Sequence, residues 1–315
     1  SEGRSALLSG AVGAGVQNTG WEFSLNTTNI DRKHFTWTSS FNISFNRNKV
    51  LALNSGQRYM LTNPNWYHQY TQDQYIAEIG MPASMMYGYV FDGIYQTSDF
   101  YYVDGKYIVK EGLPSLVGAS APMPGSIKYK DLDGDGTIDA NDMTVIGDPN
   151  PKHYGGFTNN FRLYNFDLSV FFTWSYGNDI LNANDVYFTT FENYRNNYLA
   201  KSLNYWSPTN PSNSMSAPKS FDKWVSSRSV EDGSYLRLSN VTLGYNLDAR
   251  KVKFLKKLGL TAIRVYAAAD NLFVITDYSG YDPEVNTNSS ALTRGLDYCS
   301  YPRARTFTFG LDLKF

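Results

Sequence analysis

The sequence predicts an all-β protein, specifically an antiparallel transmembrane β-barrel segment of about seven strands. Three observations predict it. Segments of about ten residues alternate between apolar and polar side chains, which is the period of a strand with one apolar face. Those apolar faces are rich in Phe, Trp and Tyr, as the aromatic girdles of membrane barrels are. Short and long connections alternate along the chain, as periplasmic turns and external loops do.

A hairpin at the middle of the chain shows the alternation most clearly. Its returning strand has an apolar face formed by Phe166, Leu168, Val170, Phe172, Trp174 and Tyr176. Its outgoing strand repeats the pattern with Phe157, Phe161 and Leu163. Only Tyr164 and Asn165 join the two segments, so the strands must be antiparallel.

Two strands are expected before this hairpin. The residues from Ser1 to Asn18 are Gly-rich without a clear period, and we interpret them as a loop. Alternation begins at Trp21, and a turn at Asn29–Lys33 leads to the second strand. The apolar face of that strand carries Phe35, Trp37, Phe41, Ile43 and Phe45. Its length of about ten residues is what a tilted membrane strand requires.

Three strands follow the hairpin. The first carries Val241, Leu243, Tyr245 and Leu247 on its apolar face, and the second carries Ile263, Val265, Ala267 and Ala269. Between them Asp248 is expected to cap a short basic amphipathic turn that ends at Gly259. The last strand, Thr306–Phe315, alternates completely, with Phe307, Phe309, Leu311, Leu313 and Phe315 on one side.

Two connections are too long for ordinary loops, and we expect both to be extracellular. Residues 52–153 include a short helix expected near Thr71–Glu78 and an acidic loop. Residues 178–232 carry apolar side chains at helical spacing, which predicts a helix packed on the loop. Those side chains are Val186, Phe191, Tyr194 and Tyr198.

Composition excludes several classes of protein. The 28 basic and 29 acidic residues leave a net charge of -1, which offers no basic field for nucleic acid. The single cysteine, Cys299, excludes an internal disulfide framework. No apolar run reaches the roughly 18 to 20 residues of a membrane helix, so a membrane role must be carried by strands. No signal peptide opens the chain at Ser1, which suggests processing or a start within a larger protein.

A soluble antiparallel sandwich also alternates apolar and polar residues, so alternation alone does not decide. The aromatic faces, the Thr, Ser and Asn residues opposite them and the loop lengths favour lipid. An odd number of strands leaves two open edges, which lipid cannot satisfy. Residues 1–315 are therefore expected to be one portion of a larger barrel.

Several blocks carry a resemblance to a known family. They are Gly20–Phe23, Asn26–Asn29, Tyr87–Gln96, Tyr129–Gly136, Gly147–Pro151, Tyr154–Phe157, Leu236–Tyr245 and Asp270–Phe273. Taken in order, these blocks resemble the C-terminal part of SusC/RagA-type TonB-linked outer-membrane proteins of Bacteroidetes. The likeness covers nearly the whole chain.

The resemblance implies a barrel of about 22 strands in the bacterial outer membrane. It implies import of glycans or peptides with a SusD-like surface lipoprotein, powered by TonB through an N-terminal part that this sequence lacks. The alternative from another class is a soluble, calcium-stabilised β-module that binds carbohydrate.

The acidic loop fits the ligand positions of an EF-hand-type calcium loop. The ligands would be Asp131, Asp133, Asp135, Thr137 through its backbone carbonyl, Asp139 and Asp142. Asp142 replaces the usual bidentate Glu, and neither flank predicts a helix, so a structural Ca²⁺ is expected rather than a sensor.

No catalytic constellation is apparent, and we predict that the protein is not an enzyme. His34, His68 and His153 are scattered. Exposed aromatics in the long loops could stack on sugars or pack within the loops. They include Tyr95, Tyr101, Tyr187 and Trp206. Phe315, a terminal aromatic on the lipid side, resembles an outer-membrane assembly signal.

Overall fold

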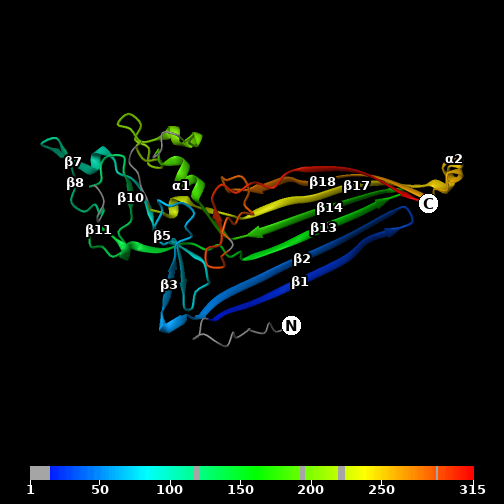
Figure 1. The fold of residues 1–315 in the computed structure, drawn as a ribbon, viewed down its shortest axis with the longest axis horizontal. Coiled ribbons are helices and arrows are strands. Elements are labelled where there is room, and N and C mark those ends of the chain that lie inside the picture. The colour runs from blue at the N-terminus through cyan, green and yellow to red at the C-terminus, as the bar shows by residue number, and fades with distance from the viewer. Residues whose placement is uncertain (1–14, 117–120, 192–195, 219–223, 289) are drawn as a thin grey trace.

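The computed structural model describes residues 15–116, 121–191, 196–218, 224–288 and 290–315. Within these residues the largest sheet has seven antiparallel strands, arranged in chain order (Figure 1). They are β1 (Gly15–Arg32), β2 (Phe35–Ala52), β13 (His153–Leu163), β14 (Phe166–Tyr176), β17 (Tyr235–Asp248), β18 (Ala262–Thr276) and β20 (Thr306–Lys314). The predicted fold class is confirmed, since every predicted strand is present in this sheet.

The pairing register keeps all apolar faces on one side of the sheet. One row of directly paired residues crosses five strands, through Leu163, Phe166, Tyr245, Val265 and Leu311. Side chains alternate between the two faces along each strand, so the face of one paired row determines the face of the remaining residues in that register. In the neighbouring strands the apolar residues pair on this same face, so the sheet has one continuous apolar face.

This apolar face is exposed rather than packed on a core. Phe309 is 82% exposed and Trp21 is 73% exposed. A soluble sheet would cover such side chains with a second layer, whereas a barrel presents them to lipid. An apolar face of this extent marks a membrane contact.

The opposite face carries a ladder of polar contacts. Arg264 Nη2 lies 2.8 Å from Asp167 Oδ2, and Arg264 Nη1 lies 3.8 Å from Asp312 Oδ2. Gly244 leaves room for this pair, because a Cβ there would lie 2.7 Å from the Asp167 carboxylate. Asn240 Nδ2 donates to Asp270 Oδ1 at 2.7 Å on the same face. These charges and amides suit a wet barrel interior.

One polar group interrupts the apolar face. Asn159 and Ser39 are paired with each other on that face. Asn159 Oδ1 accepts from Trp37 Nε1 at 2.9 Å and from Ser39 Oγ at 2.8 Å, while Ser39 Oγ accepts from Asn29 Nδ2 at 2.6 Å. Because these groups bond to one another, the polar atoms need no water.

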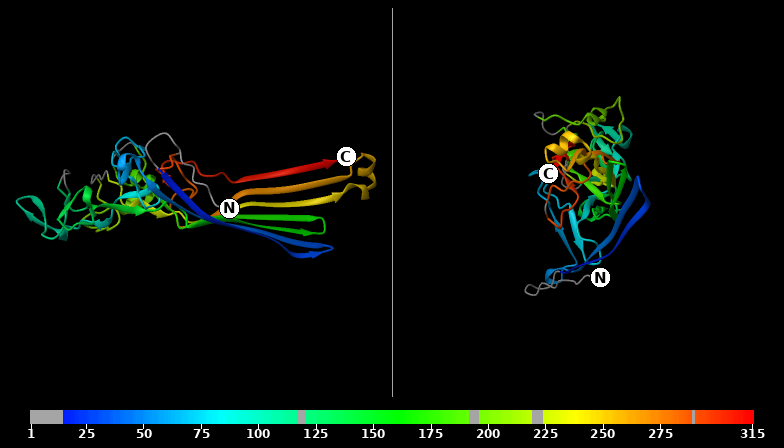
Figure 2. Two further views of the ribbon diagram at one scale, coloured as in Figure 1. Left: turned by 90° about the horizontal axis from the view of Figure 1, so that it is seen from below. Right: turned by 90° about the vertical axis from the view of Figure 1, so that its right-hand side faces the viewer.

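The long connections form smaller sheets beyond one end of the long strands (Figures 1 and 2). A four-stranded sheet contains β12 (Met143–Gly147), β5 (Met85–Tyr89), β4 (Tyr75–Glu78) and β3 (Tyr59–Thr62). A three-stranded sheet contains β16 (Val230–Asp232), β15 (Asp179–Asn182) and β19 (Leu296–Asp297). Paired strands are β10 (Ile127–Tyr129) with β6 (Phe91–Ile94), β7 (Phe100–Val103) with β8 (Lys106–Val109), and β11 (Thr137–Ile138) with β9 (Ser115–Leu116).

Helices are few and short in the described residues. The α-helices are α1 (Ala183–Thr189) and α2 (Lys253–Lys257). Single 3-10 turns occur at Asn54–Gly56, Thr97–Asp99, Ala140–Asp142, Ala200–Asn204, Ser227–Ser229 and Ala249–Lys251. No helix in this part of the chain is long and apolar enough to cross a membrane.

The hydrophobic core lies in the long connections. One buried cluster contains Tyr75, Met86, Leu181, Ala183, Val225 and Leu296. A second contains Tyr89, Ile94, Ile127, Tyr129, Ile138 and Trp206. Both connections contribute to both clusters, so the two long segments fold together as one body.

One local prediction is wrong, and two others are correct in kind but not in extent. Thr71–Glu78 contains strand β4 instead of a helix, because residues 75–78 pair with β3 and lie buried. The helix of the second connection ends at Thr189, and Phe191 already has a left-handed φ of 54°; Tyr194 is outside the described residues. Strand β1 runs from Gly15 to Arg32, so the turn is tighter than Asn29–Lys33 and residues 15–18 are not the loop that was predicted for Ser1–Asn18. Residues 1–14 of that predicted loop lie outside the described residues.

The role predicted for Phe315 concerns the end of β20. Leu313 pairs with Ile263 on the apolar face, and Phe315, two residues later, is 81% exposed. We propose that Phe315 is the assembly signal of the parent protein. Phe315→Asp should lower the amount of full-length protein in the outer membrane far more than Lys314→Asp, which alters the wet face. Equal surface levels of the two variants, measured by heat-modifiable mobility of membrane fractions, would show that Phe315 has no such role.

Candidate functional site

The acidic loop before β12 is shaped by its own carboxylates. Asp131 accepts from the amides of Gly134 and Gly136 at 2.7 and 2.8 Å, one on each oxygen. Asp135 Oδ1 accepts from the Thr137 amide at 2.7 Å. Gly134 and Gly136 have φ of 78° and 82°, a conformation that glycine adopts without strain. The sequence of alternating Asp and Gly therefore winds the chain tightly around a centre.

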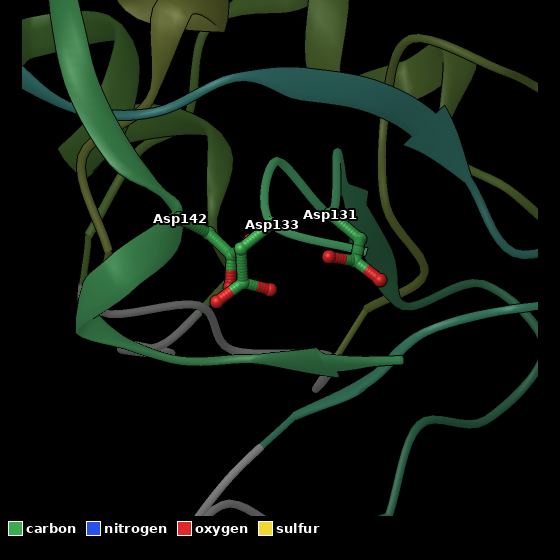
Figure 3. Close-up of side chains that lie close together, drawn as sticks. All are labelled: Asp131, Asp133 and Asp142. Atoms are coloured by element: carbon green, nitrogen blue, oxygen red, sulfur yellow. The ribbon is translucent and has the colours of Figure 1, made fainter. Parts of the chain in front are cut away.

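Three of the predicted ligands meet at that centre. One carboxylate oxygen from each of Asp131, Asp133 and Asp142 lies within 4.8 Å of the others (Figure 3). Asp142 is fully buried, and its two oxygens accept from the amides of Leu132 and Asp139 at 2.7 and 2.9 Å. The buried Asp142 therefore closes one side of the loop, and the exposed Asp133 lies on the side that is open to solvent.

The other predicted ligands are placed differently. Asp139 Oδ1 accepts from the Asn141 amide at 2.7 Å and so caps the 3-10 turn Ala140–Asp142. Asp135 and Asp139 are outside the group of converging oxygens. Thr137 belongs to β11, which pairs in parallel with β9. The structure therefore brings together Asp131, Asp133 and Asp142 but not all six residues.

Electrostatics make the centre suitable for a cation. The Gly136 amide holds the pKa of Asp131 below its ordinary value. The Asp135 amide lowers the pKa of Asp133. Desolvation and the charges of Asp135, Asp142 and Asp131 together raise that pKa by more, so it lies above its ordinary value. Converging carboxylates that repel one another fit a hard divalent cation, which binds oxygen ligands.

The loop is joined directly to the second hydrophobic cluster. Tyr129 precedes it and Ile138 lies within it, and both are buried in that cluster. The Gly136 carbonyl accepts from the Ser115 amide at 3.1 Å, which holds the β9 segment against the loop. A bound ion would therefore restrict the motion of three segments of the long connection, namely those at Tyr129, at Ile138 and at β9.

A cluster of aromatics, partly buried except for the fully buried Tyr70, forms a second candidate site. The rings come from three distant segments and are Trp66, Tyr67, Tyr70, Tyr187 and Tyr298. Trp66 stacks on Tyr70 with centroids 4.3 Å apart, and Tyr67 lies 4.7 Å from Tyr187. Burial raises the pKa of Tyr298, so its hydroxyl stays neutral and can donate a hydrogen bond. Planar faces beside neutral hydroxyls suit sugar rings or peptide groups.

The individual aromatics singled out in the sequence are in different environments. Tyr95 is buried and its hydroxyl donates to the Pro114 carbonyl at 2.5 Å. Trp206 is also buried, with Nε1 donating to Gln96 Oε1 at 2.8 Å. Tyr101 is exposed, and Tyr187 belongs to the aromatic cluster. Tyr95 and Trp206 are therefore part of the buried core of the long connections.

The three histidines lie in separate places. His34 stacks on Tyr164 at the turn of the sheet, and His68 lies beside Tyr67. His153 Nδ1 accepts from Trp174 Nε1 at 3.2 Å on the apolar face. His153 and Trp174 line an open cavity of about 380 Å³ with Leu236, Ile275 and Asp232 at its edge.

A buried ion network holds the last long connection against the sheet. Arg237 of β17 lies 2.5 Å from Asp282 Oδ1 and 2.7 Å from Glu284 Oε2. Arg303 reaches Glu284 at 3.3 Å, and its amide donates to Asp282 at 3.2 Å. The sequence contained no signal for this network, because the partners are about 45 residues apart without a motif.

Together these features define a class of protein. The lipid-facing sheet, its polar opposite face and the folded long connections are those of a segment of an outer-membrane β-barrel with elaborate loops. No family model matches the chain.

Individual proteins do match it. The TonB-dependent receptor P3 of Formosa agariphila is 40% identical over 307 residues, covering 95% of this chain and 29% of that protein. The TonB-dependent receptor SusC of Bacteroides thetaiotaomicron is 29% identical over 312 residues, covering 95% of this chain and 26% of that protein.

Solved structures give the same answer for the fold. The RagAB peptide importer in its closed-closed state superposes with a TM-score of 0.70 at 24% identity, covering 96% of this chain and 30% of that chain. Its open-open state gives 0.68 at 25% identity, covering 96% and 29%.

Over nearly its whole length the chain is similar to one part of TonB-dependent receptors of the SusC/RagA type, as its sequence blocks predict. It spans less than a third of the curated relatives that it matches, with shares of 26% to 30%.

Proposed function

We propose that the complete protein imports oligosaccharides or peptides across the bacterial outer membrane. The observation that carries this proposal is the division of the chain into a lipid-facing sheet and a separately folded body of long connections, which we propose is external. The external body would receive the substrate, and the wet face of the sheet would line its route. TonB would supply the energy through parts of the protein outside this chain.

A SusD-like surface lipoprotein is the proposed partner. The two long connections, 52–153 and 178–232, are proposed to be extracellular and to form the surface that it covers. Their shared hydrophobic clusters support this, because a rigid external body gives a partner a defined surface. The similarity to TonB-dependent receptors and to a peptide importer also supports a transporter rather than an enzyme.

The substrate class is proposed from the aromatic cluster. Tyr67, Tyr187 and Tyr298 offer ring faces and hydroxyls from segments on different connections. Glycans and peptides both bind such surfaces by stacking and hydrogen bonding. The comparisons name one substrate class only, since a peptide importer is among the solved structures and the names of the curated relatives state no substrate.

A soluble carbohydrate-binding module is the alternative. It would explain the acidic loop and the aromatic cluster equally well. It would leave the exposed apolar face unexplained, because side chains such as Phe309, at 82% exposure, would meet water.

Uptake by a deletion strain tests the proposed function. The strain is complemented with the full-length gene and grown on a panel of oligosaccharides or peptide mixtures as the sole nutrient. Growth should be restored on one class by the wild type. Tyr67→Ala/Tyr187→Ala should reduce it at low nutrient concentration by about tenfold or more, from the loss of two stacking surfaces.

The matched control is Tyr101→Ala/Tyr102→Ala, which removes two exposed rings from the β7–β8 hairpin. It should leave growth unchanged at equal surface levels. A wild-type gene that restores growth on neither class would contradict import of glycans or peptides.

We further propose that the acidic loop binds a structural Ca²⁺. Asp131, Asp133 and Asp142 would supply carboxylate oxygens, and Asp135, Thr137 and Asp139 would complete the predicted set. The convergence of three carboxylates supports this proposal, because a cation would offset the repulsion among them. The ion would only order the loop, since neither flank is a helix that could open.

Asp131→Ala/Asp135→Ala should weaken calcium binding by the full-length protein by about tenfold or more. Asp142 is left in place, because its carboxylate holds two loop amides. Calorimetry gives the affinity, and hydrogen exchange should show faster exchange in 121–147 but not in the seven-stranded sheet. The control, Asp73→Ala/Asp277→Ala, removes two aspartates outside the loop. Unchanged calcium affinity in the first variant would refute the site.

A further inference from the structure

The connection between β17 and β18 differs from the other turns at its end of the sheet. The first two hairpins close through two residues each, 33–34 and 164–165. The third contains a 3-10 turn, Ala249–Lys251, and helix α2. Figure 1 shows α2 beyond the ends of the strands, opposite the long connections. A tight turn would close this hairpin equally well, so the extra residues need another explanation.

The connection is well ordered by its own contacts. Asp248 accepts from the Arg250 amide at 3.2 Å and caps the 3-10 turn. The Leu260 amide donates to the Leu255 carbonyl at 3.2 Å, and Leu260 itself is buried. The Thr261 amide donates to the Lys314 carbonyl at 2.7 Å, which ties the connection to β20. These contacts fix the backbone that carries the outer side chains.

Those outer side chains include large apolar groups. Phe254 is 68% exposed and Leu258 is 54% exposed. They are four residues apart and so lie on the same side of the short helix. Val252 is exposed beside them. The buried residues of this connection already include Ala249 and Leu260, so the fold does not require the outer group.

The same connection concentrates positive charge. Between Asp248 and Thr261 there are five basic residues and one acidic residue, in a chain whose net charge is -1. The acidic residue is occupied, because Asp248 Oδ1 lies 2.9 Å from Arg250 Nε. Four exposed lysines remain around the apolar pair, namely Lys251, Lys253, Lys256 and Lys257.

We propose that this connection is an interfacial foot that binds anionic phospholipid in the membrane leaflet opposite the long connections. Phe254 and Leu258 insert among acyl chains, and the four lysines bind the phosphate headgroups. The foot continues an apolar face that already meets lipid, since Ile263 and Leu313 pair on that face at the adjoining strand ends. The inference rests on the membrane placement given above.

Charge complementarity and the apolar pair together favour this occupant. An acidic protein or the anionic cell wall could engage the lysines alone. Neither would account for Phe254 and Leu258 beside the lipid-facing strands, whereas a bilayer interface accepts both kinds of side chain at one depth.

Lipid retention by the full-length protein tests the foot. Protein purified in a neutral detergent is mixed with phosphatidylglycerol or phosphatidylcholine, and bound lipid is counted by native mass spectrometry. The wild type should retain more phosphatidylglycerol than phosphatidylcholine. Replacing the four lysines with Gln should lower phosphatidylglycerol retention by about tenfold or more. Phe254→Ser/Leu258→Ser should lower retention of both lipids.

The matched control replaces four lysines at the other end of the molecule with Gln, namely the exposed Lys49, Lys106 and Lys152 and the half-buried Lys110. Equal phosphatidylglycerol retention by the two quadruple variants would overturn the foot. So would isolated peptidoglycan that binds the wild type but not the foot variant while phosphatidylglycerol retention stays unchanged. Failure of the membrane placement itself is distinguishable, because the wild type would then not insert into phosphatidylglycerol vesicles.

Discussion

Hydrogen bonding of the backbone in a medium without water is the constraint on which the rest of this structure depends. In lipid every strand amide and carbonyl needs a protein partner, so only a closed sheet is stable. Five of the seven strands have a neighbour on both sides, whereas β1 and β20 have one each within the described residues. The sheet is therefore complete only as part of the larger barrel that its relatives form.

The same constraint explains where the hydrophobic core lies. Apolar side chains of the sheet face lipid, so they cannot also pack a protein interior, and the inner face is left to pairs such as Arg264 with Asp167. The buried clusters form instead in the long connections, whose apolar side chains pack against one another. Arg237 joins the two regions, since it belongs to β17 and holds Asp282 of the last connection.

The elements that the sequence predicts best are those in which a single hydrophobic period continues through the whole segment. The long strands were predictable because a period of two persists over many residues, as in β20. Strand β4 was missed because its residues 75–78 are too few to show a period and are buried on both faces. Asn159 was missed because a polar residue on the lipid face depends on a hydrogen bond from Trp37, 122 residues away. The acidic loop was recognisable from spacing, but only coordinates show that Asp139 caps a turn.

The central claim is that one face of this sheet meets lipid and the other meets water. Nitroxide labels along β20 of the full-length protein in bilayers, on a Cys299→Ser background, test it directly. We predict that labels at Phe307, Phe309 and Leu311 are accessible to oxygen dissolved in the membrane, whereas labels at Thr308 and Asp312 are accessible to a water-soluble nickel complex. Equal access of the nickel complex to all five positions would contradict the account.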